Sequence, residues 1–525
     1  MTRAPRHRVG LRRALIVNCY ADETRRGVAR VYKVPQTLGP VFLAGAFQPE
    51  HWDIRLHNEV SHGPLQDEAA LGWPDLLVLT GLVTSLDRMR HLTAYARSKN
   101  PAVVVAAGGH VVRAFPRYCA TFLDYACQGD VEELAEVIAE AFGPSHASDV
   151  WRWRFDLCDW IGRVGYAESS RYCNFACSFC TLAAEGRAYR AYDPPAIRAQ
   201  VEAAGRKKYL VFLDNNFYGN DRDSFRKRVD VAGTLRDEGH YPQWSALVTN
   251  DFFLEPGNLR LAREAGCTAL FTGVESFRRE WVLRHNKRQN AARPQVEIIR
   301  ECLESGIVFL YGLILDLTSR TIADVRAELE TILDCPDITL PSYVSLPIPI
   351  PGTPYFHECR ERDLILPSTK VRDLDATTIS LRTRDSLEEA TRFVRELQSM
   401  AGYRRRILRH SVNFWRRHRE SLTRDQMAIA LSNGALLMAP LLATGPRRLA
   451  SRGRPRTYVS STEPPDAVYT PAFRVDRRFA PYFEPAMLTD ATGEFAAALA
   501  EDLLASRPGG GAHRPAHTMV AAPEP

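Results

Sequence analysis

The sequence has neither a secretory pattern at its N-terminus nor an uninterrupted apolar run of the ~20 residues that a membrane-spanning helix needs. Without a secretory pattern, its eleven cysteines argue against a disulfide framework and predict a reducing, cytoplasmic location. The excess of positive over negative charge is also small, because the formal net charge is only +6 over 525 residues. This mild and mostly dispersed charge argues against nucleic-acid binding.

The length and composition are ordinary for a soluble globular protein of several domains. The chain is 45% hydrophobic and 25% charged, and 525 residues predict two to four domains. We place the boundaries by pattern, since strands alternate with helices in two long stretches and helices dominate afterwards. The expected units are a doubly wound domain, a connector, a barrel, a helical domain and a disordered tail, at 10–145, 146–165, 166–365, 366–505 and 506–525.

The first half predicts a doubly wound parallel sheet of the Rossmann-like α/β class. Short apolar runs alternate with stretches of helical spacing, at 14–18, 53–57, 75–81, 102–109 and 124–130. Ligands of such sheets sit outside the carboxyl ends of the strands. The candidate binding residues at those ends are Thr84, Ser85, Gly108, Gly109, His110 and Gly129.

Three cysteines stand close together in CNFACSFC, where Cys173, Cys177 and Cys180 follow the order Cys-x-x-x-Cys-x-x-Cys and Phe179 precedes the last. Three soft ligands suit iron and sulfur, whereas structural zinc sites and iron–sulfur clusters normally use four ligands. No fourth cysteine is near in sequence. The spacing therefore predicts a cluster with one open iron position, and the alternative is a zinc knuckle or a chance group of buried cysteines.

The second half predicts a partial barrel that starts just before this cysteine loop. Counting the strand that precedes the cysteines, six units of strand and helix follow one another, with the later strands at 208–216, 243–250, 267–276, 306–316 and 339–348. Active sites of α/β barrels gather at the carboxyl ends of their strands. The cysteine loop and the polar ends of the later strands are therefore expected on one edge.

The cysteine spacing and the adjacent aromatic residue resemble the signature of the radical S-adenosylmethionine (SAM) enzymes. This resemblance implies a six-stranded (β/α)6 TIM-type partial barrel, a 4Fe-4S cluster on the three cysteines and SAM chelated to the fourth iron. It further implies contacts to the amino group, ribose and adenine of SAM from polar residues and backbone near the strand ends. The residues in those positions are Asp214 and Asn215, Glu275 and Ser276, and Phe179, with helix capping as the alternative for the polar ones.

The first half resembles the cobalamin-binding domain that precedes the barrel in one branch of these enzymes. The resemblance rests on the GGH sequence at 108–110 and on GDVEE at 129–133. One feature departs from related domains that ligate cobalt, because NCYADETRRG stands where Asp-x-His-x-x-Gly would supply a histidine. The implied cobalamin would then lack a protein histidine below cobalt, and the alternative is a domain without the cofactor.

The resemblance implies a cobalamin-dependent C-methyltransferase acting on an unactivated carbon of a natural product, lipid or pigment intermediate. It also implies a small-molecule, hydrophobic substrate and an external electron donor such as flavodoxin or ferredoxin. A non-methylating cyclase or rearrangement enzyme is the enzymatic alternative, and an iron–sulfur electron carrier or scaffold is the non-enzymatic one. A methylthiotransferase is disfavoured because Cys19, Cys119 and Cys127 are scattered and form no second triad.

The C-terminal region predicts helices, among them an arginine-rich amphipathic stretch. The apolar segment 427–443 is interrupted by Ser432, Asn433 and Pro440 and is shorter than a bilayer span. We expect a buried helix pair here, and an interfacial membrane segment is the alternative.

Overall fold

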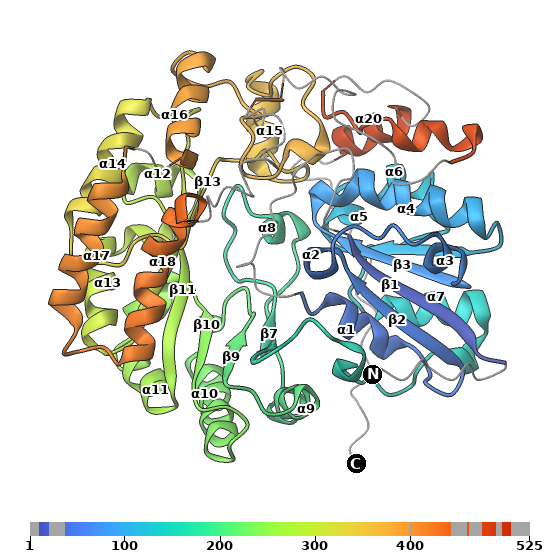
Figure 1. Ribbon diagram of the computed structural model, residues 1–525, viewed down its shortest axis with the longest axis horizontal. Coiled ribbons are helices and arrows are strands. Elements are labelled where there is room, and N and C mark those ends of the chain that lie inside the picture. The colour runs from blue at the N-terminus through green and yellow to red at the C-terminus, as the bar shows by residue number, and fades with distance from the viewer. Residues whose placement is uncertain are drawn as a thin grey trace.

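The protein contains two parallel sheets that lie side by side, with C-terminal helices packed against both (Figure 1). The computed structural model describes residues 10–19, 37–399, 402–442, 459–460, 475–489 and 496–505. The expected tail at 506–525 lies outside the described residues. The predicted α/β class is confirmed in both halves.

The N-terminal sheet has five parallel strands in the order β2-β1-β3-β4-β5. Strand β1, which lies between β2 and β3, carries six consecutive buried residues, because helices cover both faces of a doubly wound sheet. Helices α4, α5 and α6 cover one face and α1 and α7 the other (Figure 1). The strands are β1 (Arg12–Cys19), β2 (Trp52–Asn58), β3 (Leu76–Gly81), β4 (Val104–Gly108) and β5 (Tyr125–Ala126). The helices are α1 (Gly39–Leu43), α2 (Glu59–His62), α3 (Glu68–Gly72), α4 (Leu86–Lys99), α5 (His110–Ala114), α6 (Pro116–Ala120) and α7 (Glu133–Phe142).

The second sheet is the predicted six-stranded partial barrel, in the order β13-β12-β11-β10-β9-β6. All neighbouring strands are parallel, as strand–helix–strand units require. The strands are β6 (Val164–Ala167), β9 (Tyr209–Phe212), β10 (Trp244–Leu247), β11 (Cys267–Glu275), β12 (Val308–Ile314) and β13 (Tyr343–Ser345). The helices are α9 (Pro194–Ala204), α10 (Arg222–Asp237), α11 (Asn258–Glu264), α12 (Arg279–Arg284), α13 (Gln295–Glu304) and α14 (Ile322–Asp334).

The first barrel strand is shorter than the sequence pattern predicts. Strand β6 ends at Ala167, and Ser170–Arg171 (β7) pairs with Arg190–Ala191 (β8) in a separate two-stranded ladder. The cysteine loop therefore follows β7 and leads into the short helix α8 (Thr181–Glu185).

The C-terminal region divides between the two halves. Helices α16 (Leu387–Ser399), α17 (Arg404–His418) and α18 (Arg424–Leu442) lie beside the barrel, whereas α20 (Ala496–Ala505) returns to pack on α6 of the N-terminal sheet (Figure 1). Helix α15 (Pro354–Glu361) contributes Phe356 to the core cluster under α4.

The apolar segment 427–443 falls in α18, and its side chains are described as far as Gly434. Met427, Ala430 and Asn433 are buried there, and Asn433 Nδ2 donates to the Leu340 carbonyl at 2.9 Å. This part of the helix is packed as the buried-pair hypothesis predicts. Within the described ranges, no helix combines the length and apolar character needed to cross a bilayer.

Candidate active site

The cysteine loop lies beyond the carboxyl end of the first barrel strand, separated from β6 by the short strand β7. All three cysteines carry free thiols; Cys177 is buried, and Cys173 and Cys180 are partly exposed. The backbone N–H of Cys180 donates to the Cys177 carbonyl at 3.1 Å, and Cys180 is the residue directly before α8. The loop is therefore tightly turned, with its thiols on one short segment.

Residues 285–289, which follow α12, hold this loop in place. The backbone N–H of Ser178 donates to the His285 carbonyl at 3.0 Å, and Asn286 Nδ2 donates to the Ala176 carbonyl at 2.7 Å. Gln289 Nε2 lies 3.8 Å from the Cys177 sulfur, within hydrogen-bond range for a thiol. Sequence reasoning missed these residues, since no motif marks a segment more than 100 positions from the cysteines.

The cysteine side chains can bind a metal, but their burial disfavours the thiolate form when no metal is bound. Burial raises the pKa of Cys173 to about 11 and raises that of Cys180 as well, while the Lys287 ammonium lowers both. Because a metal ligates the thiolate, metal binding would displace these protons. Among the described residues, no three acidic, histidine or cysteine side chains are close enough to hold a single metal ion. A cluster differs in this respect, since each thiolate would bind its own iron.

A buried ion pair lies beside the cysteine loop. Lys287 Nζ is 2.8 Å from Glu275 Oε1, and the two side chains are only 9% and 12% exposed. Burial alone would lower the pKa of Lys287, but Glu275 and Cys177 outweigh it and hold the pKa above its usual value. The ammonium is therefore charged and lies within 5.7 Å of the Phe179 ring centroid.

Phe179 and Glu275 line one cavity of about 230 Å³ at the carboxyl ends of β11, β12 and β13. Its wall also contains Trp281, His285 and Tyr355, whose rings form a continuous aromatic contact. Pro347, Ile348 and Ile350, which follow β13, close the cavity. Two of the predicted SAM-binding residues are thus brought together.

Ser276, the neighbour of Glu275, does not line this cavity. Its hydroxyl donates to Glu328 Oε1 at 2.7 Å and accepts from Arg320 Nη1 at 3.3 Å. Both partners are buried and belong to α14 and the turn before it. Ser276 therefore joins β11 to α14 in this structure.

Asp214 is fully buried and already has protein partners. Its carboxylate accepts from the Ser169 backbone and hydroxyl and from the Ser170 hydroxyl, so it ties β9 to the segment before the cysteines. Burial raises its pKa, opposed by these hydrogen bonds. Asn215 points elsewhere, being exposed and lining a second cavity.

This second cavity, of about 270 Å³, lies where the N-terminal sheet meets the barrel. Backbone and side chains from the carboxyl ends of β3 and β4 line it together with residues that follow β6 and β9. Of the residues predicted to bind cobalamin it contains Gly108, Gly109, His110 and Gly129. Thr84 and Ser85 do not line it, because the buried Ser85 hydroxyl donates to the Cys19 carbonyl.

At two of these positions the local backbone structure itself requires glycine. Gly109 has a φ of +94°, which favours glycine, and a Cβ on Gly129 would lie 2.7 Å from Glu133 Oε2. That carboxylate accepts the Gly129 N–H, so the glycine makes room for its own chain. Bare backbone here is required by the fold whether or not a ligand binds.

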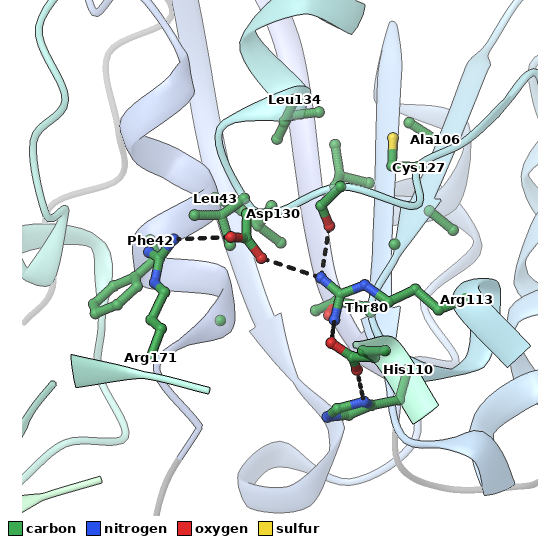
Figure 2. Close-up of a pocket in the computed structure, with 18 of the residues that line it drawn as sticks. Phe42, Leu43, Thr80, Ala106, His110, Arg113, Cys127, Asp130, Leu134 and Arg171 are labelled. Atoms are coloured by element: carbon green, nitrogen blue, oxygen red, sulfur yellow. Dashed lines mark hydrogen bonds and ion pairs between the residues drawn. The ribbon is translucent and has the colours of Figure 1, made fainter. Parts of the chain in front are cut away.

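Ion pairs connect the two halves across this cavity (Figure 2). Arg113 of α5 contacts Asp130 at 3.2 Å and Glu185 at 3.0 Å, and Glu185 also lies 2.8 Å from His110. Glu185 is the last residue of α8, which begins directly after Cys180. The helix after the cysteine loop is thus joined to the carboxyl edge of the N-terminal sheet.

Glu168 is another titratable group on the wall of this cavity. Burial raises its pKa to about 7, although Arg171, 3.5 Å away, lowers it. Sequence reasoning did not select it, since a single glutamate after a strand carries no pattern.

Comparisons with known proteins agree with this arrangement. The radical SAM superfamily model matches residues 168–330. Hopanoid C-2 methylase of Rhodopseudomonas palustris is 24% identical over 302 residues, covering 54% of this chain and 56% of that protein. Bacteriochlorophyllide d C-8(2)-methyltransferase of Chlorobaculum tepidum is 26% identical over 213 residues, covering 37% and 44%. The chain thus spans about half the length of these curated relatives.

Two solved structures share the fold. The cobalamin-dependent radical enzyme OxsB, with aqua-cobalamin and SAM bound, gives a TM-score of 0.55 at 14% identity, covering 84% of this chain and 80% of OxsB. The methyltransferase TsrM of Kitasatospora setae gives 0.51 at 15% identity, covering 67% and 76%. The fold, the cysteine loop and the superfamily match define this chain as a radical SAM protein. Within that superfamily, it is related to the cobalamin-dependent radical SAM methyltransferases.

Proposed function

We propose that this protein is a cobalamin-dependent C-methyltransferase that acts on an unactivated carbon of a hydrophobic small molecule. The observation that carries the proposal is the 270 Å³ cavity, which the carboxyl edge of the N-terminal sheet and the start of the barrel line together. A methyl donor on the sheet and a radical site on the barrel would need such a shared space. We also propose that an external flavodoxin or ferredoxin supplies electrons.

The residues present fit a 4Fe-4S cluster and SAM. Cys173, Cys177 and Cys180 are free and lie on one loop, and Gln289 donates toward the Cys177 sulfur. When bound, the cluster with SAM would supply a hydrogen-abstracting radical, and cobalamin would supply a transferable methyl group. The charged Lys287 lowers the pKa values of Cys173 and Cys180 and would compensate part of the negative charge of their metal-bound thiolates.

The aromatic wall of the smaller cavity would protect the chemistry from water. The Phe179 ring lies 6.1 Å from that of Trp281 and 5.8 Å from that of His285. Ser178 and His285 lie 3.1 Å apart through Oγ and Nδ1, so the same histidine also orients the cysteine loop. Glu275 remains our proposed acceptor for the ribose hydroxyls, held in position by Lys287.

The lining of the larger cavity suits cobalamin, but the cavity volume is too small for it. Its lining combines bare backbone at Gly108 and Gly109 with apolar side chains such as Phe42 and Leu134. Drug-sized ligands typically occupy clefts of about 300–1,000 Å³, and cobalamin is larger than these. Binding would therefore require the ion pairs around Glu185 to separate. The NCYADETRRG segment, whose lack of histidine predicts no protein ligand below cobalt, lies outside the described residues beyond Cys19.

Relatives that methylate a hopanoid or a bacteriochlorophyllide favour a lipid or pigment as the substrate class. The proposal is tested by anaerobic reconstitution with iron, sulfide, cobalamin and methyl-deuterated SAM, followed by mass spectrometry of extracts of the source cell. We expect a deuterated methyl group in a hydrophobic product, with none formed by Cys177→Ala. Formation of 5'-deoxyadenosine without methyl transfer would favour a cyclase or rearrangement enzyme. Absence of SAM cleavage by a fully loaded protein would favour an electron carrier.

A further inference from the structure

Helix α17 presents an exposed apolar row that no described residue covers. Leu408, Val412 and Trp415 are 58%, 39% and 44% exposed. They are spaced four and three residues apart, so they lie on one face of the helix. A second face of the helix is anchored, since Ile407, His410 and Phe414 are buried.

Arginines border this row. Helix α17 contains six arginines and no acidic residue in its fifteen positions. Arg406 and Arg417 pair with acidic residues of the barrel at 2.8 and 3.1 Å. The four others are exposed and make no ion pair with any residue that the structure describes: Arg404, Arg405, Arg409 and Arg416.

We propose that this face of α17 is a binding surface for an anionic membrane. The row is one residue wide, and the four guanidinium groups beside it make no ion pair with a described residue, which leaves them available to an anionic surface. A lipid headgroup layer accommodates both features, because arginines reach the phosphates while leucine, valine and tryptophan enter the acyl boundary.

The position of the helix agrees with peripheral binding. Helix α17 lies at the outer edge of the barrel, at the far end of the molecule from the N-terminal sheet (Figure 1). A bilayer could approach this edge without contacting the cavity between the two halves. The inference is independent of the proposed chemistry, since vesicle binding requires neither cluster nor cobalamin.

The test is sedimentation of the full-length protein with sucrose-loaded vesicles of phosphatidylcholine alone or mixed with phosphatidylglycerol. We expect at least tenfold more protein on the mixed vesicles at low salt and loss of this preference at high salt. Leu408→Ser/Trp415→Ser should reduce binding at least fivefold and retain the wild-type melting temperature, because both side chains are exposed.

A matched pair of charge variants separates this helix from general basicity. Replacing Arg404, Arg405, Arg409 and Arg416 with Gln should abolish the preference for anionic vesicles. The control replaces four exposed basic residues at the other side of the barrel with Gln and should bind like wild type: Arg206, Lys208, Arg226 and Lys227.

Tryptophan fluorescence reports the depth of the contact. Trp415 is one of eight tryptophans, so the difference between wild type and Trp415→Phe isolates its signal. Brominated lipids should quench that difference signal. Wild-type protein that stays in solution with both vesicle types overturns the proposal, as does unchanged binding of either α17 variant. Binding to heparin in place of vesicles would assign the face to another polyanion, and a dimer lost in the serine variant would assign it to a second copy.

Discussion

Replacing Lys287 with Met should strongly destabilise the barrel even when no cofactor is bound. The substitution keeps the length and apolar stem of the side chain but removes the ammonium that pairs with Glu275 at 2.8 Å. Glu275 then remains 12% exposed beside the Phe179 ring, as a charge without its cation. Breaking a buried pair by removing one partner costs about 3–5 kcal/mol.

The residual exposure of both side chains places the expected loss near the lower limit, at about 3 kcal/mol. For a unit of 150–250 residues, each kcal/mol lowers the melting temperature by roughly 2–4 °C. We therefore expect the barrel transition of Lys287→Met to move down by roughly 6–12 °C in calorimetry of the metal-free protein. Lys227→Met, at an exposed lysine of α10, is the matched control and should leave the transition in place.

The double variant Lys287→Met/Glu275→Gln tests whether the unpaired Glu275 carboxylate causes the loss of stability. Removing both charges eliminates the unpaired carboxylate, so most of the lost stability should return. If Lys287→Met melts with the control, the pair contributes nothing to stability and our electrostatic account of the loop is wrong. If the double variant is less stable than the single one, the carboxylate was not the source of the cost.

Three further changes test the site. Cys177→Ala should lose both the iron chromophore and 5'-deoxyadenosine formation, whereas Cys335→Ala, a partly exposed cysteine outside the loop, should retain both; iron retained in the first would refute the cluster assignment. Because burial raises the pKa of Glu168 from 4.5 to about 7, its contribution to folding is complete below pH ~4.5 and is lost as pH rises through about 7. This contribution would be about 3 kcal/mol for a fully buried group and about 2 kcal/mol for the Glu168 side chain, which is 25% exposed. In urea titrations from pH 5 to 8, the free energy of unfolding of the wild type should therefore fall by about 2 kcal/mol relative to that of Glu168→Gln. Parallel stability curves would contradict this prediction. Glu185→Gln should bind hydroxocobalamin about fivefold more tightly, since separating the ion pairs costs about 1 kcal/mol. Weaker binding would show that Glu185 instead supports the site. In the electron paramagnetic resonance spectrum of the cob(II)alamin form, nitrogen superhyperfine splitting would refute the predicted absence of a histidine ligand.

The sequence by itself was sufficient for the fold class and for placing the three proposed cluster cysteines on one loop. Apolar runs such as 14–18 and 306–316 become strands, because a sheet buried on both faces needs continuous hydrophobic residues. The three cysteines are neighbours in the chain, so their spacing alone places the thiols on one loop. Local patterns of this kind do not depend on how the rest of the molecule packs.

Only the tertiary structure decided which distant residues support that loop. His285, Lys287 and Gln289 reach the cysteines through the return of the chain after β11, and no periodicity marks them. Ser276 had the same sequence argument as Glu275, yet its neighbours on α14 direct its hydroxyl away from the cavity. A strand end places the backbone, but the partners on adjacent elements determine where a polar side chain points.

The contact between the two halves was equally beyond the sequence. His110 and Gly129 were selected as strand ends of one sheet, and Glu185 was not selected at all. Yet Glu185 pairs with His110 and Arg113, and Arg113 donates to the Gly129 carbonyl, so all three residues meet around one cavity. Helix α20, at the far end of the chain from β1, packs on the same N-terminal domain. Such pairings depend on the relative placement of whole elements, which is set by the packing of their apolar faces and leaves no trace in short sequence patterns.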